Sequence, residues 1–69
     1  MEKNIKNRNI IRSFLRDVKG LKPATWVHEF DAFYVEVWLN IDMSVSFYIT
    51  WDKAVEAYNQ HCNELLDIK

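Results

Sequence analysis

The chain has 69 residues and a mass of 8.3 kDa, which allows one domain over residues 1–69 but not both a dense core and a large substrate pocket. Hydrophobic residues make up 49% of the sequence and charged residues 28%, which excludes a disordered chain. No apolar run approaches the roughly 18 residues of a membrane span, and the first residues lack a secretory signal pattern. The single cysteine excludes an internal disulfide, so we expect a cytoplasmic protein.

Gly20 is the only glycine, and this limits the available chemistry. Loops that cradle phosphate need several glycines to bring backbone N–H groups close to the anion. A nucleophile elbow needs two glycines around its serine. We therefore expect no nucleotide-binding loop and no cofactor.

The charges are segregated along the chain, although the formal net charge is only −1. Residues 1–22 carry seven basic and two acidic side chains, whereas residues 23–69 carry two basic and eight acidic ones. Such asymmetry has two interpretations. The two parts complement each other within the fold, or they provide surfaces for charged partners.

Residues 7–19 have the periodicity of an amphipathic helix. Its apolar side consists of Ile10, Ile11, Phe14, Leu15 and Val18. Asn7 is the predicted N-cap, with Asn4 as the alternative. Gly20 predicts a Schellman ending in which the glycine is left-handed, and Pro23 then prevents the helix from continuing.

Three segments then alternate between two faces, as strands do. They are residues 25–30, 33–39 and 44–50. The predicted inner face carries Trp26, His28, Phe30, Phe33, Val35, Val37, Leu39, Val45, Phe47 and Ile49. The predicted outer face carries Thr25, Val27, Glu29, Tyr34, Glu36, Trp38, Ser44, Ser46, Tyr48 and Thr50.

The connections between these strands predict their register. A two-residue turn places Phe30 opposite Phe33. A three-residue loop at 41–43 places Val37 opposite Phe47. Both connections keep the apolar side chains on one face, but neither contains the glycine that tight hairpins prefer.

Residues 51–67 are the second predicted helix, with Thr50 as N-cap and Asp52 in the first turn. Its apolar stripe consists of Trp51, Ala54, Val55, Tyr58, Cys62, Leu65 and Leu66. The order α-β-β-β-α predicts an α+β fold of two layers, in which both helices pack on one face of a three-stranded antiparallel sheet. The other face of the sheet is then open.

This open face is the first candidate site. Tyr34, Trp38 and Tyr48 place large aromatic rings there, and such rings anchor many protein interfaces. Glu29 and Glu36 add a negative rim. We predict that these residues bind a protein partner. The alternatives are cross-strand pairs that only stabilise the sheet, and a homodimer that buries the face.

A basic ridge on the first helix is the second candidate site. It consists of Arg8, Arg12, Arg16 and Lys19. Like charges one turn apart repel each other, and cations near a helix N-terminus oppose its dipole. The ridge is therefore a solvated face, a contact with nucleic-acid phosphates, or a contact with an acidic protein.

Metal binding and catalysis have weaker support in the sequence. His61 and Cys62 are adjacent on the second helix and point about 100° apart, and His28 lies far away in the chain. Zinc needs three or four convergent ligands, so we predict no metal site. No spacing specifies a catalytic triad or a carboxylate pair, and we expect that the chain is not an enzyme.

The element order and the length resemble those of the double-stranded-RNA-binding domain, which is also α-β-β-β-α. That resemblance implies RNA binding through basic residues at the start of the second helix. In this chain the matching stretch, residues 50–56, contains Lys53 together with the acidic Asp52 and Glu56.

The chain also resembles small phage-encoded inhibitors of the anti-CRISPR and anti-restriction kind. The resemblance rests on size, an Asn-, Ile- and Lys-rich start, and a single sheet with an aromatic and acidic face. It implies a host–virus interaction in which the protein occupies the binding surface of a host enzyme without catalysis.

We therefore expect a small binding module that sterically blocks a protein partner, namely a nucleic-acid-processing enzyme of the host. The first alternative is a nucleic-acid-binding regulator that uses the basic ridge. The second alternative is a structural homodimer.

Overall fold

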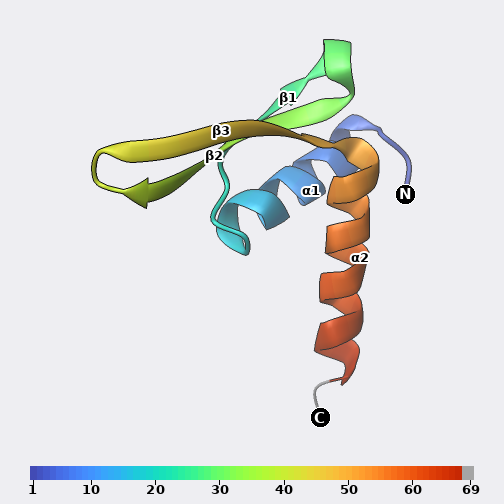
Figure 1. Ribbon diagram of the computed structural model, residues 1–69. Helices are drawn as coiled ribbons and strands as arrows, with labels where there is room; N and C mark the ends of the chain where they lie inside the picture. The colour runs from blue at the N-terminus through green and yellow to red at the C-terminus, as the bar shows by residue number, and fades with distance from the viewer. Residues whose placement is uncertain (68–69) are drawn as a thin grey trace.

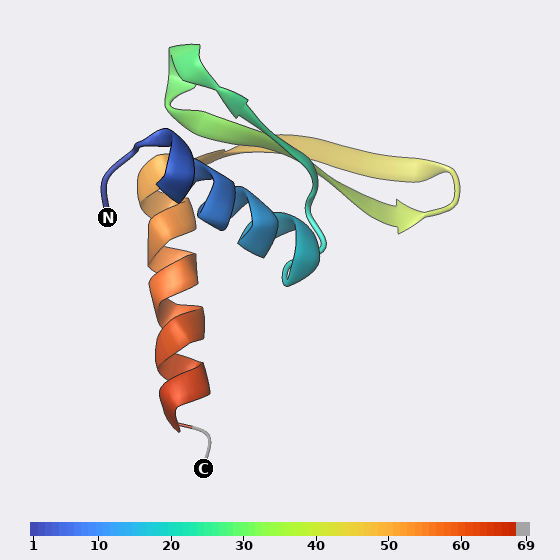
Figure 2. The same ribbon diagram turned by 180° about the vertical axis from the view of Figure 1, so that it is seen from behind.

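The computed structural model describes residues 1–67 and has the predicted α+β architecture (Figure 1). The elements are α1 (Ile5–Asp17), β1 (Lys22–Val27), the 3-10 turn η1 (His28–Phe30), β2 (Ala32–Asn40), β3 (Met43–Thr50) and α2 (Trp51–Asp67). The strands form one antiparallel sheet in the order β1-β2-β3. Both helices lie on the same side of this sheet, so its other face is open (Figures 1 and 2).

Helix α1 covers Ile5–Asp17 and not the predicted residues 7–19. It begins earlier because Asn4, and not Asn7, is its N-cap. The Oδ1 atom of Asn4 accepts a 2.8 Å hydrogen bond from the Asn7 backbone N–H. The predicted Schellman ending is confirmed. Gly20 has φ +69°, and the backbone N–H of Leu21 donates to the carbonyl of Leu15 over 2.9 Å.

The core lies where α1 crosses the sheet and meets the start of α2. Its buried residues are Ile11, Phe14, Leu15, Ala24, Phe33, Val35, Trp51 and Ala54. The half-buried ring of Trp26 packs against this core: it contacts Phe33 at 5.0 Å and Trp51 at 5.9 Å between ring centroids, both edge to face. Such contacts stabilise beyond the area that they bury.

The first hairpin differs from the predicted register, because Phe33 lies opposite Trp26 and not opposite Phe30. A two-residue turn requires left-handed backbone, which glycine adopts most cheaply, and the chain has no glycine there. It forms η1 instead and closes it with Asp31 at φ 47°, a conformation that aspartate tolerates. The register shift of four residues leaves Trp26 on the inner face.

One consequence is that His28, Glu29 and Phe30 belong to η1 and not to a strand. All three are exposed. The predictions that His28 and Phe30 face the core, and that Glu29 lies on the open face of the sheet, are therefore wrong.

The second hairpin also has a shorter connection than predicted. Val37 lies opposite Val45 and not opposite Phe47. The turn tightens without glycine because the side-chain oxygen of Asn40 accepts a 2.9 Å hydrogen bond from the backbone N–H of Asp42. Since the shift is two residues, the paired residues from Phe33 to Trp38 and from Ser44 to Thr50 keep their predicted faces. Next to the turn the register is irregular between Trp38 and Asn40.

The helices cover only part of the sheet. With 13 residues, α1 is about 20 Å long, whereas the nine residues of β2 span about 30 Å. The β2–β3 hairpin therefore extends beyond α1 (Figure 2). Helix α2 runs away from the sheet (Figure 1), so its predicted apolar stripe is buried only at its start, and Leu65 and Leu66 are 55% and 80% exposed.

Candidate functional site

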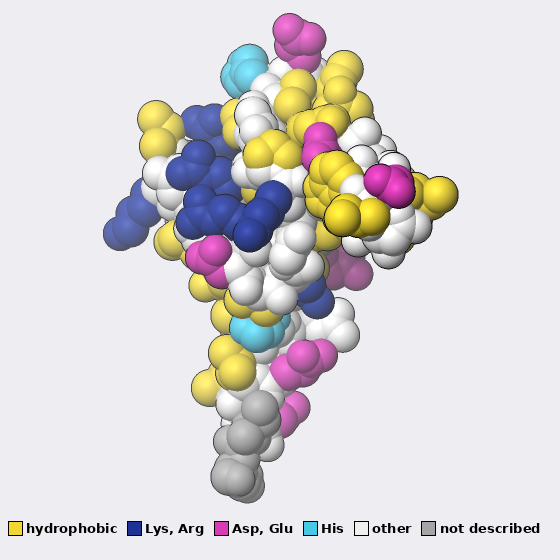
Figure 3. Space-filling view, turned by 90° about the vertical axis from the view of Figure 1, so that its left-hand side faces the viewer, with side chains coloured by type: hydrophobic (Ala, Val, Ile, Leu, Met, Phe, Trp, Pro, Cys, Tyr) yellow, Lys and Arg dark blue, Asp and Glu magenta, His cyan; other side chains and the backbone are white. Residues whose placement is uncertain are grey.

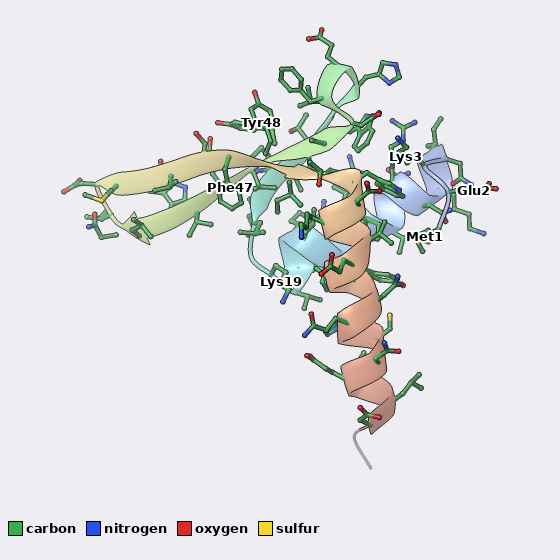
Figure 4. All side chains as sticks on the ribbon, turned by 45° about the vertical axis from the view of Figure 1, so that its right-hand side comes forward. Met1, Glu2, Lys3, Lys19, Phe47 and Tyr48 are labelled. Carbon is green, nitrogen blue, oxygen red and sulfur yellow. The ribbon has the colours of Figure 1, made fainter. Side chains whose placement is uncertain are left out.

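The side chains of β2 and β3 alternate between the helix side and the open side of the sheet. Figure 4 shows the neighbouring residues Phe47 and Tyr48 on opposite faces, with Tyr48 pointing away from the helices. Tyr48 lies opposite Tyr34 on β2, and Trp38 lies opposite Ser44. The predicted placement of these aromatic rings on the open face is therefore confirmed.

The rings on the open face contact one another. Tyr48 packs edge to face against Tyr34 at 5.7 Å and against Phe30 at 5.1 Å between centroids. The hydroxyl of Tyr34 donates a 3.0 Å hydrogen bond to the Oε1 atom of Glu36. The backbone of Lys22 on β1 pairs with that of Glu36. These contacts hold the rings and the carboxylate in a defined arrangement.

We call this surface the aromatic face and define it as Phe30, Tyr34, Glu36, Trp38 and Tyr48. Trp38 is 65% exposed, Phe30 57% and Tyr48 52%. Large aromatic side chains with so much surface in water form an apolar patch, and such patches often mark interaction sites.

Of the residues that were predicted to bind a protein partner, all except Glu29 lie together on the aromatic face. Tyr34, Glu36, Trp38 and Tyr48 share the face, whereas Glu29 lies on η1. Phe30, which the alternation places on the inner face, packs against Tyr48 instead. The signal that could have found it is the missing glycine after Phe30, which disfavours a tight turn there.

The basic ridge lies on α1, on the helix side of the sheet. Lys and Arg side chains gather on one side of the molecule in Figure 3. The guanidinium of Arg8 lies 5.2 Å above the Trp26 ring and is half-buried. Arg16 forms a 3.1 Å ion pair with its neighbour Asp17, and Lys19 lies 5.9 Å above the Phe14 ring.

These contacts show that the residues of the basic ridge differ in how free they are to bind an anion. Arg8 is a cation–π partner of Trp26 within the fold, which favours an intramolecular role for this side chain. Arg12 is exposed and makes no ion pair within the described residues. The ridge thus offers anions mainly its C-terminal part, residues 12–19.

A further exposed surface was not anticipated from the sequence. We call the β2–β3 hairpin, which extends beyond α1, the overhanging hairpin. On its helix side, Val45 is 46% and Phe47 39% exposed. The alternation of β3 predicted both as core residues. Comparison of helix and strand lengths could have shown that the hairpin extends beyond α1.

The residues that suggested a metal site lie in separate places. His28 is on η1, whereas His61 and Cys62 are on α2, where His61 packs 5.3 Å from the Phe14 ring. Among residues 1–67 no cluster of three or more potential metal ligands occurs, and no pocket is found. On α2 the Cys62 thiol raises the pKa of Tyr58, through a hydrogen bond and through its charge once ionised.

Comparison of the chain with protein-family models, curated proteins and solved structures gives no match. Within residues 1–67, no helix combines the length and the apolar character that crossing a membrane requires.

Proposed function

We propose that this chain is a small protein-binding module that docks a partner protein through its aromatic face. The observation that supports this most is the exposure of Trp38 and Tyr48 on a sheet face that carries no helix, together with the exposed ring of Phe30 that packs against Tyr48. Covering these rings removes apolar surface from water and is therefore favourable.

The arrangement of the rings supports the same proposal. Tyr48 is held between Phe30 and Tyr34, and Tyr34 is held by its hydrogen bond to Glu36. Rings that are already fixed in the free protein lose little conformational entropy on binding. Trp38 lies further along β2, where its indole is most exposed, and is the anchor of the proposed contact.

The charge of the chain suggests the kind of partner. Residues 23–69, which contain the whole of this face, carry eight acidic and two basic side chains. On the aromatic face itself the carboxylate of Glu36 lies beside exposed aromatic rings. A carboxylate in this position complements a basic cleft, and enzymes that process nucleic acids present clefts of this kind. We propose that the module occupies such a cleft and acts by steric occlusion, as the resemblance to phage-encoded inhibitors implies.

Affinity capture with matched variants tests the proposal. The immobilised wild-type protein, the Trp38→Ala variant and the Ile41→Ala variant are each incubated with the same lysate. Ile41 is 90% exposed in the turn of the same hairpin and lies outside the aromatic face, so its variant is the control. Captured proteins are identified by mass spectrometry, purified and measured by calorimetry.

We expect Ile41→Ala to bind as the wild type does, and Trp38→Ala to bind at least about tenfold more weakly, as anchor residues do. Equal affinity of the wild type and Trp38→Ala for the purified partner would contradict the proposal.

The basic ridge supports a second candidate function, because its cationic side chains gather on one side of the molecule (Figure 3). In this alternative the ridge contacts nucleic-acid phosphates. A gel-shift titration with the isolated protein tests it. Binding should weaken steeply with added salt, and the double variant Arg12→Gln/Arg16→Gln should reduce the salt dependence, whereas Trp38→Ala should leave it unchanged.

A further inference from the structure

Strand β3 forms one edge of the sheet, and its outer side is unpaired. Within the described residues its only strand partner is β2, and helix α2 meets it at one end. Almost every residue of Met43–Thr50 is exposed. On the outer side, the backbone N–H and C=O groups have no strand partner, which makes the edge a template for another strand.

The other edge of the sheet is protected in ways that β3 is not. Strand β1 contains Pro23, which cannot donate a backbone hydrogen bond, and Lys22. It also has a bulge at Ala24, where φ is 57°. Proline, lysine and bulges are devices that keep an edge strand from pairing with other chains. Strand β3 has no proline, no glycine and no charged residue.

We propose that two copies of this chain pair through β3, edge to edge and antiparallel, and form one continuous six-stranded sheet. A second copy is the occupant that fits, because β3 is complementary to itself. Its odd-numbered positions, Met43, Val45, Phe47 and Ile49, are apolar, and its even-numbered positions, Ser44, Ser46, Tyr48 and Thr50, carry hydroxyls.

In a two-fold antiparallel pair, residues that lie opposite each other share a face. A pair centred on Phe47 brings Val45 opposite Ile49, and Ser46 opposite Tyr48. A pair centred on Ser46 brings Val45 opposite Phe47. In either register, apolar side chains of one copy lie opposite apolar side chains of the other, and residues with hydroxyl groups lie opposite each other. Because β3 has no charged residue, no like charges oppose each other across the pair.

The pairing also accounts for the exposed side chains of the overhanging hairpin. Val45 and Phe47 are 46% and 39% exposed on the edge strand, in the hairpin that extends beyond α1 (Figure 2). In the pair, each would be flanked by an apolar side chain of the second copy. An interface of one eight-residue strand from each copy is small for a protein complex, so we expect a reversible dimer.

Sedimentation velocity over a range of protein concentrations tests the pairing. The wild type should shift from 8.3 kDa towards twice that mass as its concentration rises. Val45→Lys places an unpaired charge at the seam and should weaken the dimer at least about tenfold. Leu39→Lys is the matched control, because Leu39 is an exposed apolar residue of the same hairpin on the middle strand, and it should dimerise as the wild type does.

Hydrogen exchange identifies the surface that pairs. Backbone amides of residues 43–50 should exchange more slowly as the wild-type concentration rises, and this slowing should vanish in Val45→Lys. If circular dichroism shows that Val45→Lys does not fold, the double variant Ser44→Lys/Ser46→Lys replaces it, since both serines are exposed. A wild type that stays monomeric, a dimer that survives lysines on β3, or a dimer lost equally in Leu39→Lys would overturn the proposal.

Discussion

The change in the free energy of unfolding caused by Trp38→Ala distinguishes an exposed Trp38 ring from a ring in the core. Trp38 is 65% exposed, so about a third of its surface leaves water on folding, on the order of 90 Å² for a side chain of about 250 Å². At about 25 cal/mol per Å² this corresponds to about 2 kcal/mol. Because the denatured chain already buries part of that area, we expect Trp38→Ala to cost about 1 to 2 kcal/mol.

Phe33 on the same strand is the reference for a core ring. It is 0% exposed, and truncation of such a ring costs about 3 to 5 kcal/mol. A domain of this size has a total stability of roughly 3 to 10 kcal/mol, so Phe33→Ala should lose most or all of its cooperative unfolding transition.

Urea unfolding followed by far-UV circular dichroism measures both variants. The protein concentration is kept fixed, so that self-association contributes equally to each free energy of unfolding. A Trp38→Ala variant that is destabilised as much as Phe33→Ala would refute the assignment of Trp38 to an exposed face.

Three further predictions concern a single residue or a pair of residues. An added Cβ at Gly20 meets no atom within 4 Å, so Gly20→Ala should cost only the left-handed backbone strain, about 1 to 2 kcal/mol in urea unfolding, and Gly20→Asn should cost less. A double-mutant cycle of Arg8→Met and Trp26→Leu should give a coupling of about 0.5 to 1 kcal/mol, and no coupling would contradict the cation–π contact. Since Cys62 raises the pKa of Tyr58 above its ordinary value of 10.0, any stabilisation from this shift is fully present below that ordinary value and is lost as pH rises through the raised pKa. Cys62→Ala should lower the tyrosine pKa in an alkaline ultraviolet titration.

Local signals in the sequence predicted most of the fold. The bounds of α2 agree with the predicted residues 51–67, where Thr50 Oγ1 accepts a 3.4 Å hydrogen bond from the Lys53 N–H as the expected N-cap. The end of α1 was predictable because only Gly20 suits a left-handed residue there. The start of α1 was less predictable, since Asn4 and Asn7 both suit the N-cap position.

The connections between strands were harder to predict because they depend on competing turn geometries. Without glycine, the first hairpin formed η1, and its register moved by four residues, whereas the second moved by two. Both shifts are even, so the strand residues away from the irregularity at Trp38–Asn40 kept their predicted faces although the predicted partners were wrong. Phe30 was misplaced because it left the strand, and alternation no longer applies to such a residue.

The overhang of the β2–β3 hairpin links the two proposed surfaces. The hairpin extends beyond α1 (Figure 2), and it leaves Trp38 exposed on the open face and Val45 exposed on the helix side. A two-stranded ribbon of this kind is marginally stable by itself. A partner on the aromatic face and a second copy on the β3 edge would each bury what the fold leaves exposed, and they would use different sides of the same strands. Pairing at β3 would also bring two aromatic faces into one sheet, so a partner with two docking sites would bind the dimer more tightly than the monomer through effective concentration alone.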